Sequence, residues 1–489
     1  MRHALFLFLF VLTLGLGAQS TLHVDIGGGA AFTSIQTAVD AAASGDTILV
    51  QPGTYDERIT LADKSLVVRS AQGAAMTFIL PTTSGTAVAI TGSNATVVLE
   101  GFTITGNGGT GGGVFTEPGG VLLDGGVTAR LRACIIENCT GSSSSTTSPF
   151  GGTGGAGGLW VTGGAHGILE NCLVTNNQGG SGMLAGGAGG LDVAGPCEII
   201  GSVITGNTGG SQTPGALSGL GGGVGGIRYS APFSLTLSNS ILRDNHGGFS
   251  SAGVQAFAEF AIFGFLNSVN ITIDHSNVQG GLDPTIVVGA GVIDANPLFV
   301  NPMLGDYTLQ PGSPCIDAGG CGAIDPLGRD LGGDPRLRGF APDMGAFEFQ
   351  HDTTRQGTSE DILLTTVVNG NQADALTNTK TVGGGDNLVV HWESPCGSLN
   401  GALYYLGGQF YTPGQPPLSL IPGLYVDPLG GTIIQGPALM PAGGVDLMSV
   451  VPPGSFAPAI FRVQLLVVTG LAQGPFNLAT SDAQDLVLQ

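Results

Sequence analysis

Apolar and polar positions alternate in a nine-residue pattern that recurs six times between Leu99 and Gly281. Each copy reads apolar, two residues, a small or apolar residue, one residue, apolar, two residues, and usually Asn. The copies are LEGFTITGN (Leu99 to Asn107), LRACIIENC (Leu131 to Cys139), LENCLVTNN (Leu169 to Asn177), IIGSVITGN (Ile199 to Asn207), LSNSILRDN (Leu237 to Asn245) and the degenerate IDHSNVQGG (Ile273 to Gly281). Alternation of this kind predicts strands with one buried face.

The copies start 30 to 38 residues apart, a spacing too irregular for helical repeats. It suits one coil of a solenoid per copy, with a loop of variable length in each coil. A single coil cannot bury its apolar face alone, so successive coils must stack. Equivalent residues then form rows spaced about 4.8 Å apart, and a row of Asn can hydrogen-bond along the stack. The pattern therefore predicts a parallel β-solenoid.

A second pattern, a small-residue pair followed by an apolar residue, comes after each Asn turn. The apolar members are Val114, Leu159, Leu191, Ile227 and Val254. Glycine suits a sharp bend into a new strand, so each coil should contain at least two strands. The loops before these pairs vary most, as at 140–156 and 208–224, and should emerge along one edge of the solenoid. They are either filler or the wall of a binding groove.

Together these patterns resemble the right-handed parallel β-helix repeats of the pectin-lyase-like superfamily, over most of residues 30–295. The resemblance implies an all-β fold, a right-handed parallel β-helix, with a groove along the outer face of one sheet. It is evidence for a fold rather than for a chemistry.

The ends of the chain suggest further units. Residues 1–20 are typical of a secretory signal peptide, with Arg2 and His3 before an apolar run. The β-helix should then occupy residues 21–295, opening with a helix that Thr33 and Gln36 cap and that covers the first coil.

Residues 296–350 resemble the terminal segment of secreted β-helix proteins called choice-of-anchor Q, on the matching runs 296–301, 305–309, 311–319 and 343–348. We expect this segment to close the far end of the solenoid. Its Asp325, Asp330 and Asp334 could bind calcium, the one cofactor that the sequence suggests, although acidic residues in such loops more often form turns. A polar linker at 351–361 and a β-sandwich-like domain at 362–489 follow, with Trp392 and Tyr404 expected in its core.

Charge and cysteine content narrow the function. The net charge is -21 with only 14 Lys and Arg, which excludes binding to nucleic-acid phosphates. No apolar run after the leader is long enough to span a bilayer.

Of the seven cysteines, Cys315 and Cys321 are the pair that we expect to form a disulfide in an oxidising compartment. Cys134 and Cys172 share a column and could also pair, but small buried thiols are the simpler interpretation.

The candidate binding site is a stripe of outward-facing residues, each following the apolar residue after a small-residue pair. Its members are Phe115, Trp160, Asp192, Arg228 and Gln255. Aromatic rings could stack on sugars, while Asp192 and Arg228 could bind hydroxyls or a uronate. The alternative is that the aromatic rings pack under the loops and the charged residues form a surface pair.

Catalysis has less support in the sequence. A lyase needs several calcium ligands and a base, and the stripe offers one carboxylate with Arg228. A hydrolase needs two carboxylates at a fixed separation. His246 lies beside Asp244, but a turn is the simpler explanation for this pair. We therefore expect a secreted or cell-surface structural and binding protein, with polysaccharide as its partner. A polysaccharide lyase or glycoside hydrolase is the first alternative, and an adhesin is the second. The sequence predicts no particular oligomeric state.

Overall fold

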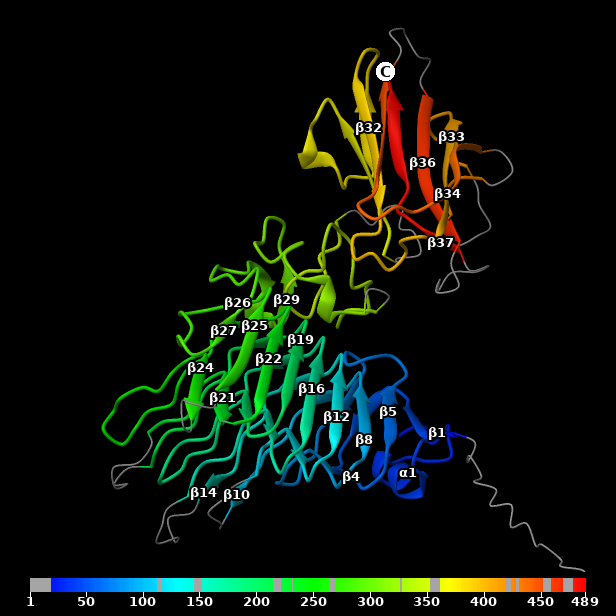
Figure 1. The fold of residues 1–489 in the computed structure, drawn as a ribbon. Helices are drawn as coiled ribbons and strands as arrows, with labels where there is room; N and C mark the ends of the chain where they lie inside the picture. Colours follow the sequence, from blue (N-terminus) through cyan, green and yellow to red (C-terminus); the bar gives the residue numbers. More distant parts are fainter. Residues whose placement is uncertain are drawn as a thin grey trace, which may run out of the picture.

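The computed structural model describes residues 19–111, 117–144, 152–213, 221–230, 232–263, 269–325, 328–351, 361–417, 424–427, 431–451, 459–468 and 478–489. In these residues the chain forms a stack of parallel coils followed by a β-domain, drawn in yellow to red in Figure 1. The expected signal peptide and most of the expected linker lie outside the described residues.

Three parallel sheets run along the stack. The ten-stranded sheet contains β1 (Thr21–Val24), β2 (Thr47–Val50), β5 (Leu66–Ser70), β8 (Thr96–Glu100), β12 (Thr128–Arg132), β16 (His166–Glu170), β19 (Cys197–Ile200), β22 (Ser234–Ser238), β25 (Asn270–Asp274) and β27 (Val287–Val288). The eight-stranded sheet contains β3 (Gly53–Tyr55), β6 (Thr77–Ile79), β9 (Thr103–Ile104), β13 (Ile135–Glu137), β17 (Leu173–Thr175), β20 (Val203–Thr205), β23 (Ile241–Arg243) and β26 (Asn277–Val278). The seven-stranded sheet contains β4 (Ile59–Ala62), β7 (Val88–Thr91), β11 (Val121–Asp124), β15 (Leu159–Val161), β18 (Leu191–Val193), β21 (Ile227–Ser230) and β24 (Phe260–Phe263).

The repeat columns are the rungs of this stack, which confirms the predicted right-handed parallel β-helix. Leu131 pairs with Leu99 on one side and with Leu169 on the other, and the column continues to Ile273. Its side chains are buried in one continuous apolar core. Since each strand pairs with its equivalent one coil on, the core extends as far as the stack does.

Buried polar ladders run beside the apolar columns. The Oδ1 atom of Asn207 accepts hydrogen bonds from the backbone N–H and the Nδ2 of Asn177, and that of Asn245 does the same for Asn207. A serine row behaves similarly, with the Ser240 hydroxyl accepting from the Ser202 N–H. These contacts satisfy buried backbone N–H groups at two turns of the central coils.

The glycine column is shifted at both ends relative to the sequence prediction. Gly158, Gly190 and Gly226 lie on consecutive rungs as expected, each packed under the carbonyl of the next rung. A Cβ on Gly158 would lie 2.6 Å from the Gly190 oxygen, so only glycine fits. In the coil after the first repeat copy, however, the residue before the strand is Gly120, which precedes β11. In the last coil of this sheet it is Glu259, which precedes β24.

The loops between the Asn turns and the glycine column, which we call the arms (140–156, 178–188, 208–224 and 246–257), are joined to one another by backbone hydrogen bonds. Gly180 donates to the Gly155 carbonyl at 2.9 Å, and Gly210 donates to the Gly187 carbonyl at 2.8 Å. A Cβ on Gly186 would lie 1.7 Å from the Gly210 oxygen, so the arms approach more closely than side chains would allow. The described part of the arms is therefore packed through its own backbone contacts. A small strand pair, β10 (Thr110–Gly111) and β14 (Ser143–Ser144), lies on the same side of the stack.

The predicted N-terminal helix is α1 (Ile35–Ala41), and its apolar face joins the solenoid core. Its N-cap is Ser34 rather than Thr33, and the Ser34 side chain accepts from the Thr37 N–H. The Glu57 carboxylate also accepts from the N–H groups of Ile35 and Gln36. A carboxylate at a helix N-terminus is favourable, so the capping box predicted from Gln36 is replaced by a partner distant in sequence.

Residues 296–350, which we call the side cap, contain β28 (Phe299–Asn301), η2 (Pro302–Leu304), β29 (Asp306–Leu309) and η3 (Cys321–Ala323). Phe299, Tyr307 and Met344 of this segment form a cluster with Leu173 and Val203 of the eight-stranded sheet. Those two side chains lie on the outer face, because the neighbouring residues Cys172, Val174 and Ile204 are in the solenoid core. We expect from the sequence that this segment closes the far end; the structure instead places it along the side of the solenoid.

The C-terminal domain is a two-sheet β structure with a core of its own, as predicted. One sheet contains β30 (Leu363–Val368), β32 (Asn387–Glu393) and β35 (Val445–Val450). The other contains β31 (Thr379–Val382), β38 (Gln484–Leu488), β36 (Ala459–Val468), β33 (Leu403–Tyr411), β34 (Thr432–Leu439) and β37 (Leu478–Thr480), and the short helix η4 (Gln372–Asp374) follows β30. Trp392 and Tyr404 are buried against each other at 5.7 Å between ring centroids, so these two rings belong to the core.

Candidate functional site

The predicted stripe is formed in its centre and is wrong at its ends. Trp160 of β15 pairs with Asp192 of β18, which pairs with Arg228 of β21. Phe115 lies outside the described residues, and Leu122 of β11 occupies the rung next to Trp160. Ala261 of β24 occupies the rung after Arg228, while Gln255 lies in the last arm and donates to the Gly247 carbonyl at 3.1 Å. The error has a simple cause: glycine pairs also occur inside the arms, so the pair alone does not mark the strand.

Asp192 and Arg228 form a largely buried ion pair, not the surface pair that was the alternative. Their side chains are 8% and 14% exposed, and the guanidinium also donates to the Gly186 carbonyl of an arm at 3.2 Å. Burial lowers the pKa of Arg228, but the charge and hydrogen bond of Asp192 outweigh it and raise that pKa overall. A general base needs the opposite shift, so this environment stabilises Arg228 as a cation.

The three outer faces of the solenoid differ in what covers them. The side cap packs on the eight-stranded face, where Leu173, Val203 and Ile241 are buried. On the seven-stranded face Asp192 and Ala261 are buried, and an arm contacts the largely buried side chain of Arg228. The ten-stranded face carries Arg69 and Thr236 exposed, and Arg130, Arg132 and Glu198 half-buried. By these side chains it is the most accessible of the three in the described residues. The side cap reaches only its edge, where Asp325 and Arg329 line a small pocket with Arg132 and Glu170.

A group of charged side chains lies on this ten-stranded face, and we call it the arginine pair site: Arg130 and Arg132 of β12 with Glu170 of β16. Both guanidinium groups bind the same Glu170 oxygen, at 2.6 Å and 3.2 Å. The arginines remain 37% and 39% exposed, whereas Glu170 is 10% exposed. Two cations thus share one carboxylate, and both keep donors at the surface.

Further polar side chains continue this face. His166 of β16 and Glu198 of β19 are 3.0 Å apart between Nε2 and Oε1. In the register of the sheet, Arg69 pairs with Glu100, and Glu100 pairs with Arg132. Cations and carboxylates therefore alternate along one row across neighbouring coils.

Sequence reasoning missed this site, although the signal for it was present. Leu131 belongs to a buried column, so Arg130 and Arg132 on either side of it must face outward. The same alternation places His166 and Glu170 on that face.

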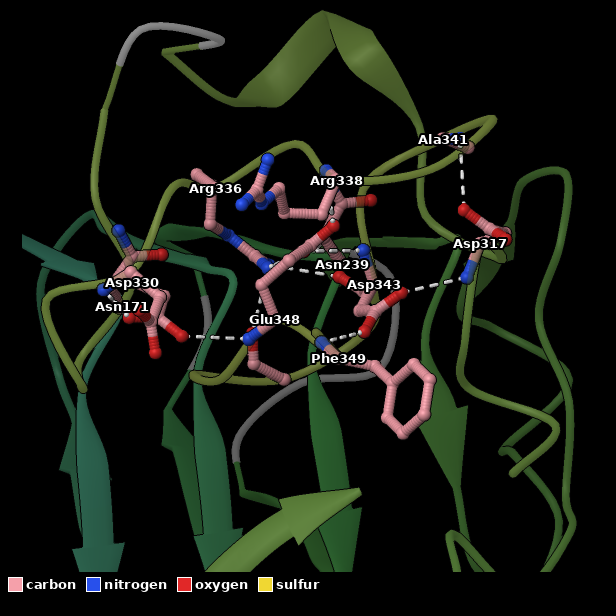
Figure 2. A network of polar contacts seen from close by, with 12 residues as sticks. Asn171, Asn239, Asp317, Asp330, Arg336, Arg338, Ala341, Asp343, Glu348 and Phe349 are labelled. Atoms are coloured by element: carbon pink, nitrogen blue, oxygen red, sulfur yellow. Dashed lines mark hydrogen bonds and ion pairs between the residues drawn. The ribbon is translucent and has the colours of Figure 1, made fainter. Parts of the chain in front are cut away.

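The acidic residues of the side cap form a structural network rather than a metal site (Figure 2). Asp330 accepts hydrogen bonds from the N–H groups of Asp334 and Glu348, so both of its carboxylate oxygens are engaged. Asp325 and Asp334 are exposed. Among the described residues, no three His, Cys, Asp or Glu side chains come together in a group that could hold a metal ion. The calcium expectation therefore has no support in this geometry.

Arg336 is the centre of that network. Its buried guanidinium contacts the Glu348 carboxylate at 2.8 Å and donates to the carbonyls of Asp343 and Gly345. Burial raises the pKa of Asp330 to about 6 and that of Asp343 to about 7, and it raises the pKa of Glu348 well above the usual range. Three carboxyl groups share a single cation, and they hold the side cap in its fold.

The predicted disulfide between Cys315 and Cys321 is wrong. Cys321 is bonded to Cys396 of the C-terminal domain, while Cys315 is a free thiol buried in the side-cap cluster. Cys134 and Cys172 are also free and buried, with their thiols donating to backbone carbonyls. The partner of Cys321 comes from another domain, so spacing along the chain could not reveal it.

Comparisons with known proteins concern the fold. No family model and no curated protein matches the chain. A solved pectate lyase is 14% identical, covers 68% of this chain and 97% of its own, and has a TM-score of 0.32. A pectin methylesterase mutant in complex with a hexasaccharide (12% identity) and the pectin methylesterase PemA from Erwinia chrysanthemi (11%) each cover 59% of this chain and 98% of their own, with TM-scores of 0.27. Likenesses this low support no argument about the chemistry of this chain. Separately, none of the described helices has the length and hydropathy of a membrane span.

Proposed function

We propose that this protein is a secreted polysaccharide-binding protein whose ligand lies on the outer face of the ten-stranded sheet, at the arginine pair site. One observation carries the proposal: Arg130 and Arg132 remain more than one third exposed on the most accessible of the three faces. Rungs spaced about 4.8 Å apart offer an extended chain repeated polar contacts.

The exposed arginines of the site favour an acidic polysaccharide. Two guanidinium groups share the Glu170 carboxylate, and the next carboxylate of the row, Glu100, lies one rung away beside Arg132. A uronate carboxylate matches the planar donor fork of arginine and would bind the donors that Glu170 leaves at the surface. The Glu170 bridge holds both guanidinium groups in place before the ligand arrives, which lowers the entropic cost of binding.

Secretion is part of the proposal. The N-terminal twenty residues are typical of a signal peptide, and the Cys321–Cys396 disulfide suits an oxidising compartment.

The test is calorimetric titration of the full mature chain with polygalacturonate and with neutral dextran. We expect binding to polygalacturonate alone. Loss of charge-assisted hydrogen bonds in Arg130→Ala/Arg132→Ala should weaken it by about tenfold or more. The matched control is Arg58→Ala, because Arg58 is exposed in the segment before β4, away from the ten-stranded sheet. Equal affinities in the wild-type protein and the double variant would overturn the proposal.

The same mixtures should be followed for unsaturated products and new reducing ends. Formation of either product would make the protein a lyase or a hydrolase, and a purely binding role would then be wrong.

A further inference from the structure

Two columns of the solenoid end together at Glu259, the residue directly before β24. The first is the glycine column Gly120, Gly158, Gly190 and Gly226, in which a Cβ would meet the carbonyl of the next rung. A Cβ on Gly226 would lie 2.4 Å from the Glu259 oxygen. In the described residues no further rung of this sheet follows Glu259, since β24 is the last of its seven strands. The end of the stack is therefore where this column can carry a side chain.

The second column is the asparagine ladder. Each ladder Asn donates through its backbone N–H and its Nδ2 to the Asn one coil on, but the coil after Asn245 has Gly281 in the corresponding position of the repeat. Glu259 takes over as acceptor: its two carboxyl oxygens accept from the Asn245 N–H at 3.1 Å and from Nδ2 at 2.6 Å. The carboxyl group thus terminates a buried hydrogen-bond ladder.

An open pocket of about 340 Å³ lies at this carboxyl group. Its lining includes Glu259 itself, Asp244 and His246 from the turn after β23, Phe257, Phe260 and Gln279. Phe257 is 73% exposed, and Glu259 is 7% exposed. The volume is at the lower end of the range for small-molecule sites, so it suits a compact group rather than a polymer chain.

The charges around Glu259 are unbalanced. Asp244 is the second acidic side chain of the pocket, and none of the described lining residues is Lys or Arg. The adjacent residue Arg243 directs its guanidinium to Asp294 at 2.6 Å and to Asn277. Burial raises the pKa of Glu259 to about 7, although both hydrogen bonds from Asn245 act against this. A buried carboxylate is favourable when a cation pairs with it.

We propose that this pocket binds an organic ammonium group, with Glu259 as its counter-ion and Phe257 and Phe260 as aromatic walls. Carboxylates attract the positive charge, and the faces of aromatic rings interact favourably with alkylammonium ions. Primary amines and quaternary trimethylammonium groups share this chemistry. The inference does not depend on the polysaccharide site, which lies on a different sheet.

The test uses calorimetric titration of the full chain with choline, with n-butylammonium and with 3,3-dimethyl-1-butanol, the uncharged analogue of choline. We expect at least one of the cations to bind and the alcohol not to bind. Because the cation favours ionised Glu259, its affinity should rise by about tenfold between pH 6 and pH 8. Preference for choline would identify a quaternary group, and preference for n-butylammonium a primary amine; either supports the proposal. Binding of the alcohol as tight as that of choline, or no binding of either cation, would overturn it.

Variants separate the role of Glu259 from that of His246, another ionisable residue of the pocket. Glu259→Gln should weaken cation binding and remove its pH dependence, whereas His246→Gln should retain that dependence. A pH dependence that disappears in His246→Gln and persists in Glu259→Gln would contradict the assignment. Phe257→Ala alters an exposed side chain and should leave the fold intact, so it should reduce affinity without lowering the melting temperature. Unchanged affinity in that variant would rule out the aromatic wall.

Discussion

The asparagine ladder makes single buried amides important for stability. Asn207→Ala removes the acceptor of two buried donors, the N–H and the Nδ2 of Asn177. We expect the free energy of unfolding in urea to fall by about 2–4 kcal/mol, because buried donors would be left without a partner. Asn107 is the matched control: it occupies the same column but is exposed, and its side chain accepts from Gly109. Asn107→Ala should cost less than about 1 kcal/mol. Equal losses would contradict the ladder argument.

The ion pair of Asp192 and Arg228 allows a second test at this scale. Asp192→Asn leaves the guanidinium buried without its counter-ion and should cost about 3–5 kcal/mol. The double variant Asp192→Leu/Arg228→Met removes both charges and should cost clearly less. Denaturant unfolding of the three proteins measures the difference. A double variant less stable than Asp192→Asn would show that the pair is not the isolated buried unit that we describe.

Residue-level prediction worked wherever alternation alone decides which way a side chain points. Leu99, Leu131 and Leu169 are buried rungs as predicted, and Trp160, Asp192 and Arg228 share a row. What alternation cannot tell is what covers an outward residue. Asp192 was expected on the surface and is buried instead, since an arm packs beside it.

At the scale of elements, the side cap should respond to pH. Its three buried carboxyl groups have folded pKa values above the ordinary ones, mainly through burial. In the unfolded chain they ionise near pH 4, so between about pH 4 and pH 7 the folded state binds more protons. Their contribution to stability is therefore complete below pH 4 and is lost as the pH rises through 6 and 7. The melting temperature should fall between pH 5 and pH 8.

Glu348→Gln separates this effect from the general repulsion in a chain of net charge -21. The variant lacks one of the three groups, so its melting temperature should depend less steeply on pH between 5 and 8, whatever its absolute stability. An unchanged slope would show that the side-cap carboxyl groups do not cause the effect.

The position of the side cap was not predicted, but the chain held a signal for it. Leu173, Val203 and Ile241 occupy outward positions of the eight-stranded sheet and are apolar, which indicates a covered face. Which segment covers that face depends on contacts between residues distant in sequence. The loops show a different limit. Their small-residue pairs look like the pairs that precede strands of the seven-stranded sheet, so the sequence alone could not show where β11 and β24 begin.

At the scale of the whole molecule, the Cys321–Cys396 disulfide and the ion pair between Arg338 and Asp482 join the side cap to the C-terminal domain. The disulfide closes a loop of 75 residues, and the loop-entropy model gives a stabilisation of about 4.5 kcal/mol. Cys321→Ser/Cys396→Ser should therefore lower the free energy of unfolding by about 2–5 kcal/mol. A non-reducing peptide map should link Cys321 to Cys396 and find Cys315 free. A link between Cys315 and Cys321 would contradict the structure.

The three faces of the solenoid differ in what covers them. The side cap lies on the eight-stranded face, an arm contacts the seven-stranded face, and the ten-stranded face is met by the side cap only at the edge beside Arg132 and Glu170. The most direct test is hydrogen exchange of the full chain with and without oligogalacturonate. The account predicts that added protection is concentrated in β12 and β16, the strands of the arginine pair site. Protection confined to β15 and β18 on the seven-stranded sheet, or no protection at a saturating ligand concentration, would contradict it.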